Sequence, residues 1–292
     1  MPIVFERHVK RIMQRLGYEL RPLAPCDLRG QVTHPVEAAY VANFALSVVD
    51  VRLSDCRGYY GLRFNMHHPF VRAARAYMDG TASSYEGSPL EAYYSHFQPK
   101  HAGDLFVLPP PPSLLEEVPP FAFVWPWDSE SVQARLQDRL VRIKKENEAR
   151  GVRLSMSHGY NSYGPVSQHK GNIEFLALAR LVDSIWQKGY VRNDEPDGDV
   201  RVIPLINEKL SVRYLVRWGH HRVSALAALG FERLPVAINF GFPVRVVEAE
   251  FWPHVKSGLF THDQAIILFD KIFSGTPASK VVPPGWRRQY SN

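Results

Sequence analysis

A strand followed at once by a helix is the feature that most constrains this chain. The strand pattern over residues 214–218 stops at Gly219, and a helical pattern begins directly after it with His220, His221 and Arg222. The start of a helix attracts anions, because its first backbone N–H groups have no intrahelical partners and it carries the positive end of the helix dipole. The stretch therefore predicts a phosphate or carboxylate site. The alternative is a corner whose polar residues only cap and solvate the turn.

The composition indicates a folded chain that suits anionic partners. It has 292 residues, of which 45% are hydrophobic and 12% aromatic, enough for the core of one large domain or two ordinary ones. This excludes wholesale disorder. The formal net charge of +6 suits nucleotides, nucleic acid or an anionic membrane surface, and selects none of them.

Cysteine usage and hydropathy predict a cytoplasmic setting. Cys26 and Cys56 show neither metal-ligand spacing nor a disulfide framework. The first residues are too polar for a signal peptide, and no run of about 18 apolar residues predicts a membrane-spanning helix. Residues 3–16 alternate apolar and basic side chains. They predict an amphipathic helix that either docks on the protein or rests peripherally on an anionic membrane.

The first half contains two helical patterns with a polar, aromatic stretch between them. Helices are expected over residues 38–51 and 69–78. His67 and His68 have no carboxylate or cysteine at a metal-binding spacing, which favours a turn that leads into a helix over a metal site. Several side chains here are candidate contacts to a polar, anionic acceptor: Arg63, His68, Arg72, Tyr94 and His96.

A proline-rich segment marks the expected boundary between two parts of the chain. Four consecutive prolines at 109–112 exclude helix and predict an extended connection, and the aromatic residues that follow predict that it packs. We expect a mostly helical N-terminal region over 1–127 that shapes an acceptor site, a second domain over 128–276, and a tail over 277–292. A helix over 129–150 carries the strongest basic cluster, whose interspersed acidic residues favour a solvated face over a nucleic-acid-binding stripe.

The second part alternates helices and strands. A polar loop leads into a helix over 173–188, for which Asn172 is the expected N-cap and Gly189 the stop. Further elements are expected as strands over 200–206, 234–238 and 244–250, and as a helix over 262–273.

The order of these elements resembles the ParB/sulfiredoxin superfamily. The motifs that carry the resemblance are the helix end Asp183–Gly189, the turn Gly219–Arg222, the helix end Leu229–Gly230 and the strand Leu234–Val236. The resemblance covers about residues 160–240. It implies an α/β (α+β) fold in which the Gly-x-x-Arg turn binds nucleotide phosphates. Members include partitioning proteins that bind CTP and DNA, a sulfinic-acid reductase that uses ATP, and small-molecule kinases such as the free-serine kinase.

Three departures favour the kinase branch of that superfamily. The turn reads Gly219-His-His-Arg222, whereas partitioning proteins typically carry Gly-Glu-Arg-Arg. It holds no cysteine, which the reductase needs. Only about 50 residues follow the resemblance, too few for the helix-turn-helix region of the partitioning proteins.

The resemblance also implies which residues form the site, because its topology brings the loop before residue 173 toward the Gly219 turn. Arg222 and the backbone of the turn would hold phosphate, His220 or His221 would contact phosphate or transfer a proton, and Glu174 would be the base for an acceptor hydroxyl. Four more phosphate contacts are expected: Ser167, His169, Lys170 and Ser224. For Glu174 a purely helix-stabilising role stays open, and for Lys170 a solvated one.

The leading hypothesis is an ATP-dependent kinase that acts on a small molecule or sugar. Mg²⁺ would be held mainly by phosphates and water, because no carboxylate ligand set stands out in the sequence. The leader, a basic helix followed by Gly17–Arg21, resembles those of cytoplasmic proteins from bacterial surface-polysaccharide loci, which implies a role in polysaccharide synthesis. The alternatives are a ParB-like nucleic-acid-binding or nuclease-type protein and a non-catalytic nucleotide-binding module.

Overall fold

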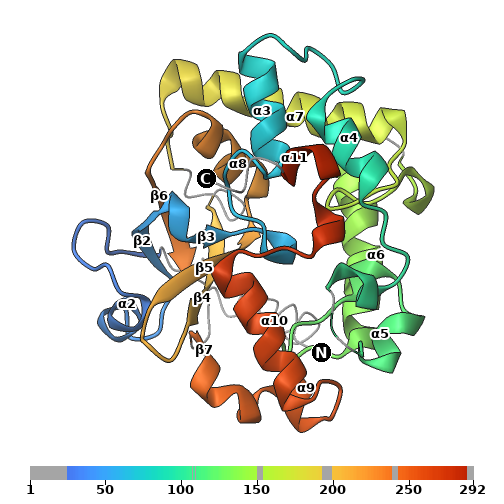
Figure 1. Cartoon of the computed structure of the whole chain (residues 1–292). Helices are drawn as coiled ribbons and strands as arrows, with labels where there is room; N and C mark the ends of the chain where they lie inside the picture. The colour runs from blue at the N-terminus through green and yellow to red at the C-terminus, as the bar shows by residue number, and fades with distance from the viewer. Residues whose placement is uncertain are drawn as a thin grey trace, which may run out of the picture.

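A computed structural model describes residues 25–106, 108, 110–149, 154–192, 199–238 and 243–287. It is a mixed α/β structure in which helices surround one sheet (Figure 1). The strands are β1 (Cys26–Asp27), β2 (Ser47–Arg52), β3 (Cys56–Arg57), β4 (Arg201–Ile206), β5 (Val212–Trp218), β6 (Arg233–Ile238) and β7 (Val244–Arg245). The helices are α2 (Pro35–Val41), α3 (Pro69–Met78), α4 (Pro89–His96), α5 (Ser113–Glu117), α6 (Val132–Ala149), α7 (Gln168–Lys188), α8 (His220–Ala228), α9 (Pro253–Lys256), α10 (His262–Ser274) and α11 (Pro284–Arg287).

The sheet joins strands from both halves of the chain. Its order is β1-β2-β6-β4-β5-β3, with β7 also paired to β4. The long pairs β2–β6 and β4–β5 are antiparallel, and β6 runs parallel to β4. Since β2 and β3 come from the first half, the expected boundary near residue 127 does not separate two sheets. One hydrophobic core contains buried residues from Leu28 to Val282, so the expected N-terminal region and second domain share it.

The segment predicted as one helix over 38–51 divides into a helix and a strand. Helix α2 ends at Val41, and β2 begins at Ser47. The physical reason is tertiary: Val48, Val49 and Val51 are β-branched and buried, and β2 pairs along its length with β6. That part of the helix prediction was wrong.

Other boundaries also differ from the expectations. Helix α7 begins five residues early, because Ser167 and not Asn172 is the N-cap and accepts a hydrogen bond from the Lys170 N–H. The strand expected over 244–250 is only two residues long and continues as a 3₁₀ helix, Val246–Phe251. The expected tail packs as far as it is described, since Val281 and Val282 are buried. The helix expected over residues 3–16 lies outside the described residues.

Three helices meet around the predicted anion site. Helices α3, α7 and α8 pack against one another, and Figure 1 shows them in the upper part of the view, above β6 and β3. The prediction of α3 is confirmed, with the same bounds, and the strand–turn–helix from β5 to α8 is confirmed as well. This arrangement brings the start of α8 close to residues from the first half of the chain.

Candidate functional site

The turn between β5 and α8 requires glycine. Gly219 has the left-handed conformation, with φ 91° and ψ 22°. A Cβ there would lie 3.0 Å from Val200 Cγ2, so a side chain would be strained and crowded. The N-cap Gly219 has no side chain and makes no capping hydrogen bond, whereas Ser167 caps α7 and Thr261 caps α10. The first N–H groups of α8 therefore keep their capacity to bind an anion.

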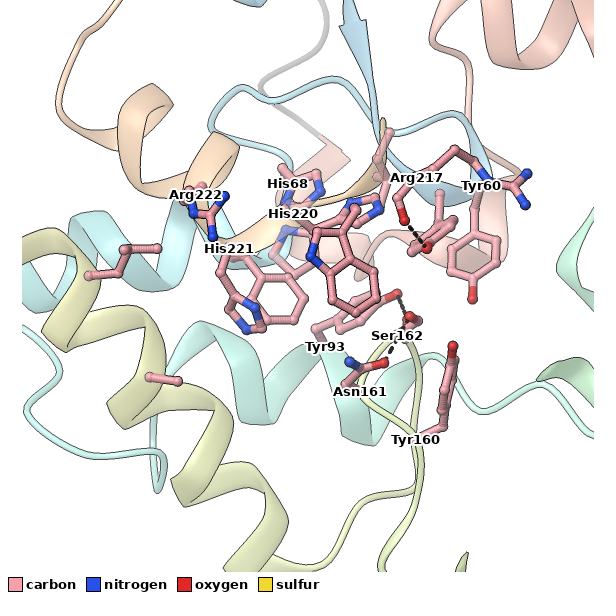
Figure 2. A pocket seen from close by; sticks show the side chains of 18 of the residues that line it. Tyr60, His68, Tyr93, Tyr160, Asn161, Ser162, Arg217, His220, His221 and Arg222 are labelled. Atoms are coloured by element: carbon pink, nitrogen blue, oxygen red, sulfur yellow. Dashed lines mark hydrogen bonds between the residues drawn. The ribbon is translucent and has the colours of Figure 1, made fainter. Parts of the chain in front are cut away.

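A cavity of about 450 Å³ opens at this helix start. Its walls come from the end of β5, the start of α8, the start of α3, the middle of α7, the turn Tyr59–Gly61 and the loop 160–162 (Figure 2). The loop is held in place by α4, since the Tyr93 hydroxyl donates to Ser162 O at 2.7 Å and the Tyr94 hydroxyl to Asn161 O at 2.6 Å. The volume is that of a typical small-molecule site.

The charge on the cavity wall is one-sided. Arg139, Arg217 and Arg222 line the cavity, and none of the described residues that line it is Asp or Glu. Arg222 also hydrogen-bonds the hydroxyl of Tyr190, whose pKa is raised chiefly by burial. Fixed guanidinium charges of one sign on the wall of a cavity attract anions.

Two histidines of the wall are neutral. Burial lowers the pKa of His220 well below its usual value and lowers that of His68 to about 3. His220 stacks on Tyr59 at a ring distance of 4.0 Å, and His68 stacks on Phe64 at 4.5 Å. The buried Nε2 of His220 has no hydrogen-bond partner among the described residues. These imidazoles therefore act as hydrogen-bonding groups and do not supply positive charge.

Behind the wall lies a buried ion pair, Lys170 and Glu174, which also contacts His221. Glu174 is fully buried; its Oε1 lies 2.8 Å from Lys170 Nζ and its Oε2 lies 3.1 Å from His221 Nε2. His221 in turn lines the cavity, and its side chain is 25% exposed. The contact between these two atoms is electrostatic, because neither His221 Nε2 nor Glu174 Oε2 makes a hydrogen bond to any described residue. The negative charge beside Nε2 favours the single proton of a neutral imidazole on that nitrogen, which leaves Nδ1 as an acceptor.

The residues expected to act together are only partly brought together. His68, Gly219, His220, His221 and Arg222 line the cavity. Lys170 and Glu174 lie behind it and pair with each other, so neither is a lining group. Ser167 is the cap of α7, His169 is exposed, and Ser224 is fully buried; none of these three lines the cavity.

Two of the expected acceptor contacts point elsewhere. Arg63 hydrogen-bonds the carbonyl of Ser274 at the end of α10. Arg72 lies over the ring of Trp286 at 4.9 Å. Neither arginine lines the cavity, and the residues of α3 that do line it are Pro69 and Phe70.

The sequence analysis missed several wall residues. Arg217 was hidden in an apolar strand, and Arg139 was interpreted as part of a solvated basic face. Among the others are Tyr59, Tyr60, Tyr160, Asn161, Ser162 and Trp218. Only the position of Arg217, two residues before the glycine turn, was a usable signal.

The described residues do not fit a protein-held metal ion. Nowhere in the described ranges do three His, Cys, Asp or Glu side chains gather as metal ligands. The cavity wall offers no carboxylate either. The free thiols Cys26 and Cys56 are not joined by a disulfide. Within the same ranges, no helix is long and apolar enough to cross a membrane.

No family model, curated protein or solved structure matches this chain.

Proposed function

We propose that the protein is a nucleotide-dependent kinase that phosphorylates a hydroxyl group on a small molecule or sugar. The observation that carries the proposal is the cavity at the uncapped start of α8, walled by three arginines and by no carboxylate among the described residues. A likeness of residues 160–240 to the ParB/sulfiredoxin fold, and a place in surface-polysaccharide synthesis, are parts of the same proposal.

The phosphates bind at the glycine turn. The backbone N–H groups at the start of α8 and the guanidinium of Arg222 hold the terminal phosphate of the donor. The aromatic wall formed by Tyr59, Trp218 and Tyr160 suits a planar base or a sugar face. An anionic group and a flat, partly apolar group are the two parts of a nucleotide.

His221 is the base in this mechanism, and Glu174 positions it. The acceptor oxygen forms a bond to the terminal phosphorus while the bond from that phosphorus to the bridging oxygen breaks, and the nucleoside diphosphate leaves. The hydroxyl proton passes to Nδ1 of His221. Glu174 stabilises the resulting imidazolium through Nε2, and Lys170 fixes the carboxylate from its other side. Glu174 is thus a positioning residue, because it is too deeply buried to touch the acceptor.

Mg²⁺ does not enter these steps. The described residues of the cavity wall supply no carboxylate for it, so a divalent ion would be held by the nucleotide and water.

The proposal is tested with the full chain in two stages. Thermal shifts are first measured with ATP, ADP, GTP and CTP, with and without Mg²⁺. Arg222→Ala removes a charge-assisted contact and should weaken nucleotide binding about 10- to 150-fold. The matched control Arg142→Ala removes an exposed arginine of α6 that pairs with Asp138, and should leave binding unchanged. Absence of a shift with every nucleotide contradicts the proposal.

Turnover is then measured as release of the nucleoside diphosphate in the presence of acceptors. His221→Asn should abolish turnover with little change in nucleotide affinity. Binding without turnover by the wild type would identify a non-catalytic nucleotide-binding module. Binding of DNA with a steep salt dependence, and of no nucleotide, would favour the nucleic-acid alternative. The structure gives that alternative less support, because Arg135 of α6 is buried and paired with Asp128 and Glu130.

A further inference from the structure

A short loop, residues 159–165, forms one wall of the cavity. Tyr160 and Tyr163 pair as an isolated antiparallel bridge, so Asn161 and Ser162 form the tip of the loop between them. Both tip residues line the cavity, and Asn161 carries the one carboxamide among the described residues that do so. An amide can hydrogen-bond an uncharged part of a ligand as donor and as acceptor, whereas the arginines of the wall can only donate.

The backbone under this tip is fixed by helix α4 and the residue after it. As described above, the two tip carbonyls accept hydrogen bonds from the hydroxyls of Tyr93 and Tyr94. The N–H of Gly164 donates to Phe97 O at 2.8 Å, and a Cβ on Gly164 would overlap the carbonyl oxygen of Tyr94. The loop therefore packs against α4 as closely as a backbone can. A side chain on such a tip is placed before a ligand arrives, which is what selectivity requires.

The amide of Asn161 has hydrogen-bonding capacity left for a ligand. Its Oδ1 accepts from the Ser162 hydroxyl at 3.2 Å, which uses one of two lone pairs. Its Nδ2 donates to none of the described residues and is not enclosed by them, and the residue as a whole is half-buried. Figure 2 shows this nitrogen on the side of the amide that faces away from Ser162. Asn161 thus offers a ligand one donor beside one acceptor.

This pair of groups matches adenine better than the other bases. The 6-amino group of adenine is a donor with an acceptor nitrogen on each side, N1 and N7, so a carboxamide can pair with either edge of the base. Guanine offers two acceptors, O6 and N7, on its major-groove edge, and a carboxamide oxygen would find no donor there. The rings of Tyr160 and Trp218, which also line the cavity, supply faces on which a purine stacks.

We propose that Asn161 selects the donor nucleotide by pairing with the 6-amino group and a neighbouring ring nitrogen of adenine, so that the donor is ATP. The inference rests on the proposed function, which places the phosphates at Arg222. Figure 2 shows Asn161 and Arg222 well apart, with His221 between them in this view. A nucleotide with its base at Asn161 and its terminal phosphate at Arg222 therefore passes His221, the proposed base for the acceptor hydroxyl.

The test removes the two partners of this contact separately and together. Calorimetry compares ATP with purine riboside 5′-triphosphate, which lacks only the 6-amino group. The wild-type chain should bind the analogue about 5- to 150-fold more weakly than ATP, the range for one bidentate base contact. In Asn161→Ala, ATP should bind as weakly as the analogue, to within twofold. Equal affinities in the wild type, or an undiminished preference for ATP in Asn161→Ala, overturn the proposal.

A second variant and a control separate recognition from folding. Asn161→Leu keeps the approximate size of the side chain without its hydrogen bonds, should give the same result, and replaces Asn161→Ala if that variant does not fold. Asn172→Ala is the matched control, because Asn172 is a half-buried asparagine of α7 that does not line the cavity. It should leave both affinities unchanged.

This inference and the kinase proposal fail in different ways. A preference for ATP that disappears in Asn161→Ala, in a chain that transfers no phosphate, refutes the kinase and leaves Asn161 as the selective residue of a nucleotide-binding module. Phosphate transfer from ATP with equal affinity for the analogue supports the kinase and refutes the role of Asn161. Failure to bind any nucleotide refutes both.

Discussion

Replacing Glu174 by glutamine should destabilise the protein strongly, because it removes the negative partner of the buried ion pair between Lys170 and Glu174. Glutamine keeps the shape of the side chain. It removes the carboxylate that lies 2.8 Å from the Lys170 ammonium, whose side chain is only 8% exposed. Breaking a buried pair on one side typically costs about 3–5 kcal/mol, since the remaining charge is left in a medium of low dielectric. For a chain of this size the corresponding fall in Tm is about 6 to 20 °C.

The assay is equilibrium unfolding in urea, followed by circular dichroism and tryptophan fluorescence. The double variant Lys170→Met/Glu174→Leu removes both charges and should recover most of the loss, to within about 1 kcal/mol of the wild type. The matched control is Asp138→Asn, which breaks the i,i+4 pair with Arg142 on the surface of α6. That exposed pair should be worth less than about 1 kcal/mol.

Two results would refute this reasoning. The first is a loss in Glu174→Gln no larger than in Asp138→Asn, which would mean that water reaches Lys170. The second is a double variant less stable than the single one, which would mean that packing and not charge decides the stability of this region.

Two further predictions concern pH and the glycine turn. Burial lowers the pKa of His68 to about 3 in the folded state. Below pH 6.5 the unfolded chain therefore binds a proton at this histidine more readily than the folded chain, and the free energy of unfolding decreases as the pH is lowered. The loss from this group should be about 2 kcal/mol at pH 5, and His68→Gln but not the exposed control His96→Gln should remove it, as measured by urea unfolding at pH 7.5 and 5. Gly219→Ala should cost about 1–2 kcal/mol for its left-handed backbone and more for the contact with Val200, and should reduce the thermal shift with nucleotide. Gly230→Ala has a similar φ but open space around the new Cβ, so it should show only the backbone loss; equal losses would contradict the crowding argument.

The parts of the site that sequence reasoning found are local ones. A glycine that separates a strand pattern from a helix pattern predicts a tight turn, and the basic residues after it predict an anion site. The structure has that turn at Gly219, with His220, His221 and Arg222 on the cavity wall. The helix α3 could be predicted to the residue for the same reason, since Pro69 and the periodicity after it lie within one short segment.

The parts that sequence reasoning missed depend on contacts between distant segments. Arg139 and Arg217 are 78 residues apart and line the same cavity only because α6 and β5 both face it. The carboxylate of Glu174 could not be assigned to chemistry or to structure until its burial against Lys170 and His221 was known.

By itself, the sequence determined the mixed α/β character, the turn at Gly219 and the cluster of His220, His221 and Arg222 at the helix start, because each follows from residues within one or two turns of each other. The tertiary structure alone decided that β2 joins the second half's sheet, that Arg63 and Arg72 face away from the cavity, and that Glu174 lies behind His221. The physical reason is that burial and charge pairing are properties of surfaces that meet in three dimensions, and local patterns do not record which surfaces meet.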